Sequence, residues 1–137
     1  MRQVAVFNTN VMFSATGWRG SPFLCLELAR SGAVEGITCW ELLDELTEKL
    51  QTKLRFTSAQ ADDTVIDLLS FLRLVHITGQ LKAVLSDPDD DKTIESAVVA
   101  QASHIVTGDR RHLLPLRTFQ GVSIVTPAEF LAIVSAP

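Results

Sequence analysis

The chain has 137 residues and a formal net charge of −4, and 47% of its residues are hydrophobic. This length predicts a single domain over residues 1–137, and the apolar content excludes an intrinsically disordered chain. No apolar run approaches the roughly 20 residues of a membrane span, and no leader pattern opens the chain, so a soluble cytoplasmic protein is expected. The net negative charge argues against nonspecific binding of nucleic acid by the whole surface. It is compatible with a local basic patch.

Cysteine and histidine are too sparse for a disulfide framework or a typical zinc site. We expect Cys25 and Cys39 to be buried and reduced. The three histidines, His76, His104 and His112, lack the spacing of metal-binding histidines.

Short apolar runs alternate with helical patterns along the chain. This alternation predicts the α/β fold class, with a mostly parallel sheet covered by helices on both faces. The apolar runs 4–7 and 104–106 are typical of central strands, and Ser58 is the expected cap of the helix that it begins. The predicted strands are residues 4–7, 33–38, 74–77, 104–109 and 122–126, and the predicted helices are residues 21–32, 40–54, 58–74, 87–103 and 127–134.

Polar residues stand where the predicted strands end. In parallel sheets, ligands bind beyond the carboxyl ends of the strands, so these residues are candidates for function. The stretch VAVFNTNVMFSA (4–15) is the clearest example, because its apolar strand stops at two amides and a hydroxyl. The candidates at strand ends are Asn8, Asn10, Thr107, Asp109 and Thr126.

The stretch SDPDDDKTIESAVVA (86–100) begins with four aspartates. Asp87 can cap a helix that starts at Pro88, and carboxylates near a helix N-terminus stabilise it by about 0.3–1 kcal/mol each. Helix stabilisation is the main expectation for Asp87, Asp89 and Asp90.

Asp91 differs from the other three aspartates, because it shares a helix face with Ile94 and Val98. Removing a carboxylate from water costs free energy, and a carboxylate on a buried helix face therefore needs a partner, such as a divalent cation, that offsets this cost. A capping residue and a metal ligand are equally good interpretations of Asp91. Glu95, one turn later, is a further ligand or a charge at the rim.

Two more acids complete the candidate set. Asp109 follows a buried strand in a Gly-Asp turn, which is often only a turn, and Thr107 either orients a carboxylate or simply ends the strand. Glu45 can pair with Lys49 one helical turn away, or lean over the sheet edge beside the stripe of leucines in its helix. Clustered carboxylates are suitable ligands for Mg²⁺ or Mn²⁺, and metal sites of this kind catalyse phosphodiester hydrolysis.

Four stretches in order resemble the PIN-domain family, and in particular its branch of VapC-like ribonucleases, the toxins of type II toxin–antitoxin systems. They are VFNTNVMFSA, CWELLDELTEKLQTKLRF, DPDDDKTIESAVVAQASHIVTGDRRHLL and GVSIVTPAEFLAIV. The resemblance covers nearly the whole chain. It implies a three-layer α/β/α sandwich and Mg²⁺- or Mn²⁺-dependent cleavage of RNA. It also implies a small antitoxin as partner, and a homodimer.

The resemblance also assigns residues by position. The family's acidic quartet, which holds the metal and carries catalysis, falls on Asn8, Glu45, Asp91 and Asp109, and its orienting residues fall on Asn10 and Thr107.

Asn8 departs from the family pattern, which has aspartate at this position. An amide oxygen can coordinate a cation but brings no charge and cannot act as a carboxylate base. An engineered change, a natural degenerate member, and compensation by Glu95, Asp89 or Asp90 all remain open. The alternative function is therefore a catalytically inactive PIN-like domain that binds RNA or a protein partner.

Basic residues near the predicted rim are candidates for RNA contact: Arg19, Arg110, Arg111 and His112. The alternative for Arg110 and Arg111 is a solvated turn. A histidine at this position can also assist proton transfer. Trp18 and Trp40 are expected to be core or interface anchors rather than platforms for stacked bases.

Overall fold

The computed structural model describes residues 2–81 and 88–136. The strands are β1 (Gln3–Phe7), β2 (Val34–Thr38), β3 (Leu72–Leu74), β4 (His104–Val106), β5 (Thr118–Phe119) and β6 (Val122–Val125). The helices are α1 (Thr9–Gly17), α2 (Ser21–Arg30), α3 (Trp40–Lys53), α4 (Ser58–Leu69), α5 (Pro88–Ala100), the short 3₁₀ turn η1 (Leu114–Leu116) and α6 (Pro127–Ser135).

The strands form one mostly parallel sheet in the order β3-β2-β1-β4-β6-β5. β1 pairs in parallel with β2 on one side and with β4 on the other, and only β5 runs antiparallel, against β6. The chain moves from β1 outward to β3, and α5 then carries it back to the far side of β1. The carboxyl ends of β1 and β4 therefore flank the point where the strand order reverses, which is where open α/β sheets bind ligands.

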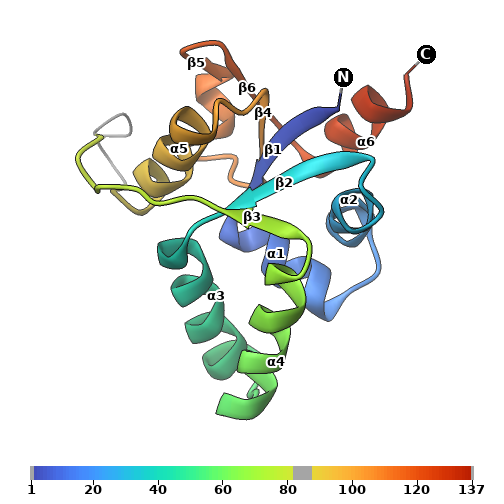
Figure 1. Cartoon of the computed structure of the whole chain (residues 1–137), viewed down its shortest axis with the longest axis vertical. Coiled ribbons are helices and arrows are strands. Elements are labelled where there is room, and N and C mark those ends of the chain that lie inside the picture. The colour runs from blue at the N-terminus through green and yellow to red at the C-terminus, as the bar shows by residue number, and fades with distance from the viewer. Residues whose placement is uncertain (1, 82–87, 137) are drawn as a thin grey trace.

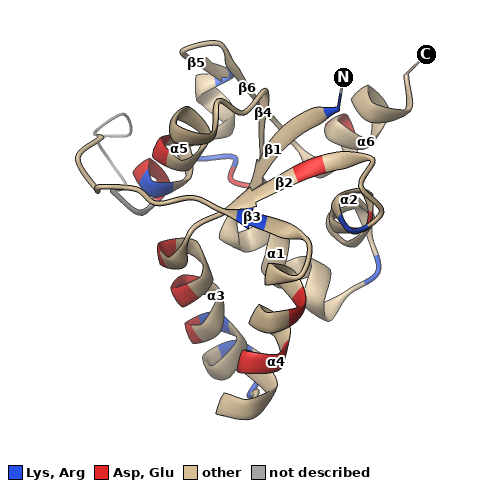
Figure 2. Cartoon of the chain, viewed as in Figure 1, with Lys and Arg blue, Asp and Glu red and all other residues tan. Residues whose placement is uncertain are grey.

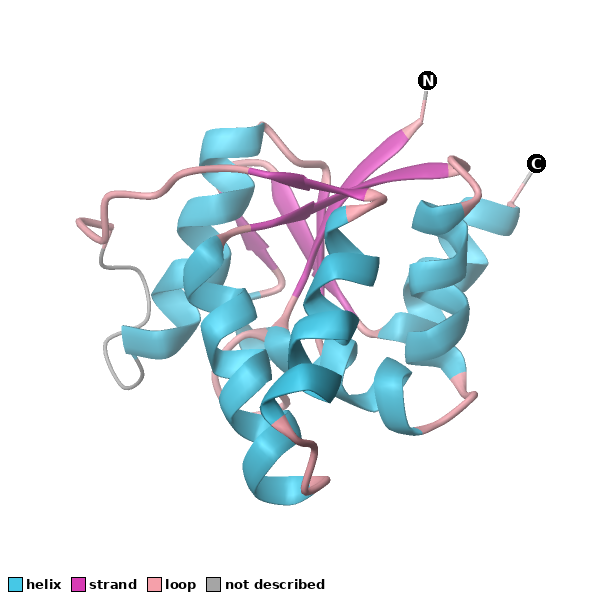
Figure 3. Cartoon of the chain, turned by 60° about the horizontal axis from the view of Figure 1, so that its bottom comes forward, coloured by secondary structure: helices cyan, strands magenta, loops and turns pink. Residues whose placement is uncertain are grey.

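Helices cover both faces of this sheet. α5 contacts β1, β2 and β4, whereas α2 packs on β2 and against α1 and α6. Figure 1 shows α5 on one side of the sheet and α2 with α6 on the other. In Figure 3 the strands run across the upper part of the view, with most helices below them. The predicted three-layer α/β/α sandwich is confirmed.

The two central strands are buried on both faces, as their uninterrupted apolar sequences predict. Ala5, Val6 and Phe7 of β1 and Ile105 and Val106 of β4 have no exposed surface. Burying such side chains contributes roughly 1.5–3 kcal/mol each, so these strands fix the position of the polar residues that follow them. Cys25 and Cys39 are free and buried, as predicted.

Most predicted elements are confirmed, and the differences have local causes. Helix α1 was not predicted, because its apolar residues continue directly from the strand. The predicted helix 58–74 ends at Leu69, and its last residues form β3, which replaces the strand expected at 74–77. The short β5 and η1 were not predicted either.

The expectation that Ser58 caps its helix was wrong. The cap of α4 is Thr57, whose hydroxyl accepts the Gln60 N–H while the Gln60 side chain accepts the Thr57 N–H. Trp18 and Trp40 are 57% and 47% exposed, which excludes the core alternative, and their expected role as interface anchors stays a prediction. Asp87 lies outside the described residues, so its predicted capping role is untested.

Among residues 2–81 and 88–136, no helix combines the length and the apolar character needed to cross a membrane.

Candidate metal-binding site

A cavity of about 360 Å³ opens at the carboxyl ends of β1 and β4. The residues that line it come from four places in the chain: the β1–α1 junction, α3, the first turn of α5 and the turn after β4. They are Asn8, Thr9, Asn10, Glu45, Lys49, Asp90, Asp109 and His112. The switch point of the sheet therefore gathers acids that are far apart in sequence.

Asn8 ends β1 and caps α1. Its Oδ1 accepts the backbone N–H of Asn10 at 3.1 Å, which is the interaction of a helix N-cap. Its Nδ2 donates to Thr93 Oγ1 of α5 at 3.0 Å, and the residue is only 7% exposed. The amide thus ties β1, α1 and α5 together at the edge of the cavity.

Asn10 and Thr107 both hold the turn that follows β4. The Asn10 Oδ1 accepts the N–H of Gly108 at 3.3 Å, and the buried Thr107 Oγ1 accepts the N–H of Asp109 at 3.0 Å. These two bonds fix the backbone N–H groups of Gly108 and of Asp109 itself, so both side chains contact the turn as orienting residues would.

Asp109 organises its own turn. Its Oδ1 accepts the N–H groups of Arg111 (3.0 Å) and His112 (3.2 Å), and its Oδ2 accepts that of Leu113 (3.3 Å). Burial by itself raises the pKa of Asp109. The hydrogen bonds with Asp90 and with these three N–H groups outweigh burial, so the pKa lies below its usual value. Asp109 is therefore held as a carboxylate that points into the cavity.

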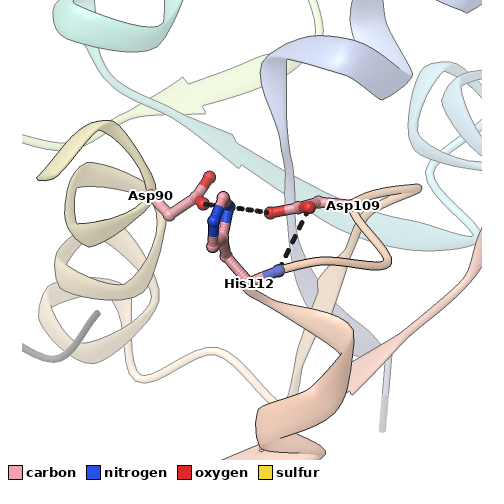
Figure 4. A group of neighbouring side chains, drawn as sticks. All are labelled: Asp90, Asp109 and His112. Atoms are coloured by element: carbon pink, nitrogen blue, oxygen red, sulfur yellow. Dashed lines mark hydrogen bonds and ion pairs between the residues drawn. The ribbon is translucent and has the colours of Figure 1, made fainter. Parts of the chain in front are cut away.

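Among the described residues, Asp90, Asp109 and His112 form a group whose side chains could bind one metal ion, and Figure 4 shows it between α5 and the turn after β4. The His112 Nδ1 lies 3.4 Å from Asp90 Oδ2 and 3.6 Å from Asp109 Oδ2. One oxygen or nitrogen from each residue lies within 4.8 Å of the others. Two carboxyl groups this close share a proton in their hydrogen bond, and they repel each other when both are ionised. A cation between them would replace that proton and offset the repulsion.

Glu45 of α3 supplies the third carboxylate of the cavity. Its Oε1 lies 3.3 Å from Lys92 Nζ, and both side chains are partly exposed. Lys49, the partner expected from helical spacing, also lines the cavity. Figure 2 shows basic and acidic positions side by side on α3 and at the start of α5. The acids therefore lie among cations rather than in a purely acidic surface.

Three other sequence candidates do not line this cavity. Asp91 is 5% exposed but is not among the lining residues, because neighbouring residues of a helix do not face the same side. The carboxylate that α5 presents to the cavity is that of Asp90. Arg19 stacks its guanidinium on Phe23 at 4.3 Å, in a separate cavity that shares no lining residue with this one. Glu95 faces residues 78–81.

Arg110 and Arg111 directly follow Asp109 and are exposed. Their position beside the cavity is the one expected for contact with a polyanion, and it equally fits the solvated turn that was the alternative. Sequence reasoning named Asp90 as a helix-stabilising residue or a compensating ligand and His112 as a basic residue at the rim, but it did not predict that the two lie together in the cavity. The sequence signal for His112 was its place three residues after Asp109, since an aspartate often closes such a turn.

The donor set fits a hard divalent cation. Asp90, Asp109 and Glu45 offer carboxylate oxygens, Asn8 and Asn10 offer amides at the rim, and the cavity is large enough for an ion that keeps several waters. The close approach of Asp90 and Asp109 is the observation that supports this fit, because a shared cation would offset their repulsion.

Fold and cavity together define an α/β protein with a candidate acidic metal site at the switch point of a parallel sheet. The family model described as PIN domain matches residues 4–111, which include all the strands and helices that build the cavity. The chain belongs to the PIN domain family.

Solved structures with the same fold share little sequence with the chain. VapBC2 from Rickettsia felis, in a crystal structure bound to a DNA fragment from their promoter, is similar with a TM-score of 0.62 and 14% identity. That match covers 90% of this chain and 98% of the other. PAE2754 from Pyrobaculum aerophilum has a TM-score of 0.63 and 15% identity, over 99% of this chain and 91% of the other. No curated protein sequence matches the chain.

Proposed function

We propose that this chain is a metal-dependent endoribonuclease that hydrolyses RNA phosphodiester bonds with Mg²⁺ or Mn²⁺ in the acidic cavity. The observation that carries the proposal is the convergence of Asp90 and Asp109 at the switch point of the sheet. A divalent ion bound there supplies an activated water and stabilises the leaving oxygen. Membership of the PIN family supports the same reaction class.

In this proposal, Asp90 and Asp109 bind the metal, and Glu45 is the third carboxylate. Asn8 occupies a ligand position with a neutral amide. Asp91, which the family resemblance assigns to the quartet, is kept as a candidate to be tested beside Asp90, because it lies one residue away and is buried.

The remaining roles follow from position. Asn10 and Thr107 orient the turn that carries Asp109. Arg110 and Arg111 contact the RNA backbone from the exposed side of that turn. Arg19, in its separate cavity, has no geometric support for this role.

The partners are also part of the proposal. We propose that the chain acts as the toxin of a toxin–antitoxin pair, as a single cytoplasmic domain over residues 1–137 that binds a small antitoxin and forms a homodimer. The similar VapBC2 structure supports the pairing. Large apolar side chains exposed on the described part of the chain support a protein–protein surface, among them Trp18, Leu24 and Ile66.

Replacement of Asn8 by aspartate tests the proposal directly. We expect Asn8→Asp to raise the rate of RNA cleavage with Mn²⁺ at least about tenfold, because one more negative charge strengthens metal binding. The fold should tolerate the change. Aspartate caps a helix as well as asparagine does, and the Thr93 hydroxyl can rotate to donate to a carboxylate.

The control is the double variant Asn8→Asp with Asp109→Asn, which should lose the gained cleavage while remaining folded. If Asn8→Asp cleaves none of a varied set of RNAs, the nuclease proposal fails for this chain.

The hydrogen bond from Asn8 Nδ2 to Thr93 favours a second candidate function. Both ends of the amide make hydrogen bonds that hold the fold, as they would in a non-catalytic PIN-like domain that binds RNA or a protein partner. RNA binding without cleavage by both the original chain and Asn8→Asp would support this function.

A further inference from the structure

We infer that His112 is a metal ligand of the acidic cavity and that its imidazole makes the site prefer Mn²⁺ to Mg²⁺. This inference rests on the proposed metal-dependent function and deepens it. It adds a nitrogen to a site otherwise made of oxygens, and it names the ion that the site selects.

The separations of the His112 nitrogen from both carboxylates already suit one shared ion, and the ligand atoms of all three residues lie within 4.8 Å of one another. Atoms bound to a metal at about 2.1 Å lie about 3.0 Å apart at a right angle and about 3.4 Å apart at a tetrahedral angle. The His112 Nδ1 lies 3.4 Å from Asp90 Oδ2 and 3.6 Å from Asp109 Oδ2. Little side-chain movement is therefore needed for all three atoms to contact the same ion.

The backbone holds His112 in this position. Its N–H donates to Asp109 Oδ1 at 3.2 Å, and the Asp109 carbonyl oxygen accepts the N–H of Leu114 at 3.0 Å. The next residue, Leu113, is completely buried and anchors the turn in the core. One turn therefore holds both an acid and an imidazole at the cavity. Ion binding then carries little entropic cost for fixing these two side chains.

The ligand type determines the preferred ion. Mg²⁺ binds oxygen ligands and retains water, whereas imidazole nitrogen favours first-row transition metals. Two carboxylates and an imidazole therefore favour Mn²⁺ over Mg²⁺ more strongly than carboxylates alone.

Calorimetric titration of the purified chain with MnCl₂ and, separately, with MgCl₂ tests the inference without any measurement of cleavage. We expect His112→Gln to weaken Mn²⁺ binding about tenfold and to leave Mg²⁺ binding unchanged or slightly tighter, so that the preference for Mn²⁺ falls. The matched control is His76→Gln, which replaces an exposed histidine outside the cavity and should leave both affinities unchanged.

A second measurement needs no substitution at position 112. Electron spin-echo modulation of Mn²⁺ bound to the original chain detects a directly coordinated nitrogen. A ¹⁴N coupling that persists in His76→Gln supports the inference, and its absence overturns it.

The failure of the inference differs from the failure of the proposed function. If both ions bind and Asp109→Asn weakens them, but His112→Gln leaves the Mn²⁺ preference unchanged or higher, only the role of His112 is overturned. If neither ion binds the original chain, or Asp109→Asn has no effect, the metal site itself is overturned, and the inference falls with it.

Discussion

Helix α5 buries carboxylates in two regions that differ in what surrounds them. Glu95 is 6% exposed and faces the segment after β3, where its oxygens accept the N–H groups of Thr78 (2.6 Å), Gly79 (3.1 Å) and Leu81 (3.4 Å). Asp90, five residues earlier, faces a second carboxylate and an imidazole instead. Burial by itself therefore does not identify a metal ligand.

The difference lies in the electrostatic partners of each acid. Burial raises the pKa of Glu95, but the hydrogen bonds from backbone N–H groups and from the Thr78 hydroxyl outweigh it and lower the pKa. That carboxylate is a structural anchor for residues 78–81. Asp90 and Asp109 each have the other acid as a close neighbour. A bound cation would therefore stabilise the cavity more than it would stabilise the surroundings of Glu95.

The largest expected effect separates Asp90 from its neighbour Asp91. We expect Asp90→Asn to weaken Mn²⁺ binding about 100-fold, because it removes one of the two closest carboxylates. Asp91→Asn should have a much smaller effect, since Asp91 does not line the cavity. Calorimetry on both variants measures the difference. A larger loss in Asp91→Asn would return the ligand role to the residue assigned by the family resemblance.

Glu95 should show the opposite behaviour. We expect Glu95→Ala to lower the free energy of unfolding by about 2 kcal/mol, because several N–H groups lose a charged acceptor. Metal affinity should be unchanged. Urea unfolding and calorimetry on the same sample measure the two quantities, and a clear loss of Mn²⁺ binding would mean that the two regions are not independent.

The smallest effect is a pH dependence that belongs to Glu95. The pKa of Glu95 in the folded chain lies below its ordinary value of 4.5, so its contribution to stability is complete above that value. The contribution is lost as the pH falls from 4.5 through the pKa of the folded state.

The measurement compares unfolding free energies of the original chain and Glu95→Gln from about pH 6 to about pH 3. The unfolding free energies of the two proteins should converge as the pH falls. A gap that stays constant over this range would show that the hydrogen bonds of Glu95 do not depend on its charge.

The sequence predicted the fold well because its signals were local. Apolar runs such as those of β1 and β4 are typical of central strands, and the ends of these strands bring Asn8 and Asp109 to the same edge of the sheet. Helix α1 was missed because its N-cap, Asn8, was interpreted only as the end of a strand.

The site was predicted less completely, because it depends on packing. Asp91 does share the buried face of Ile94, as expected, but the cavity lies beside that face, where the preceding residue points. The orientation of a helix about its own axis comes from contacts with β1, β2 and β4, and periodicity alone does not give it. His112 reaches the cavity only through the turn that Asp109 closes.

The hydrogen bonds of Asn8 have a consequence for how this protein can change over generations. Its oxygen caps α1, and its nitrogen meets a hydroxyl that can accept or donate. Asparagine and aspartate can therefore exchange at this position with little penalty to folding. A single base substitution converts one codon into the other. Mutation at position 8 can therefore change the net charge of the cavity while the fold around it stays the same.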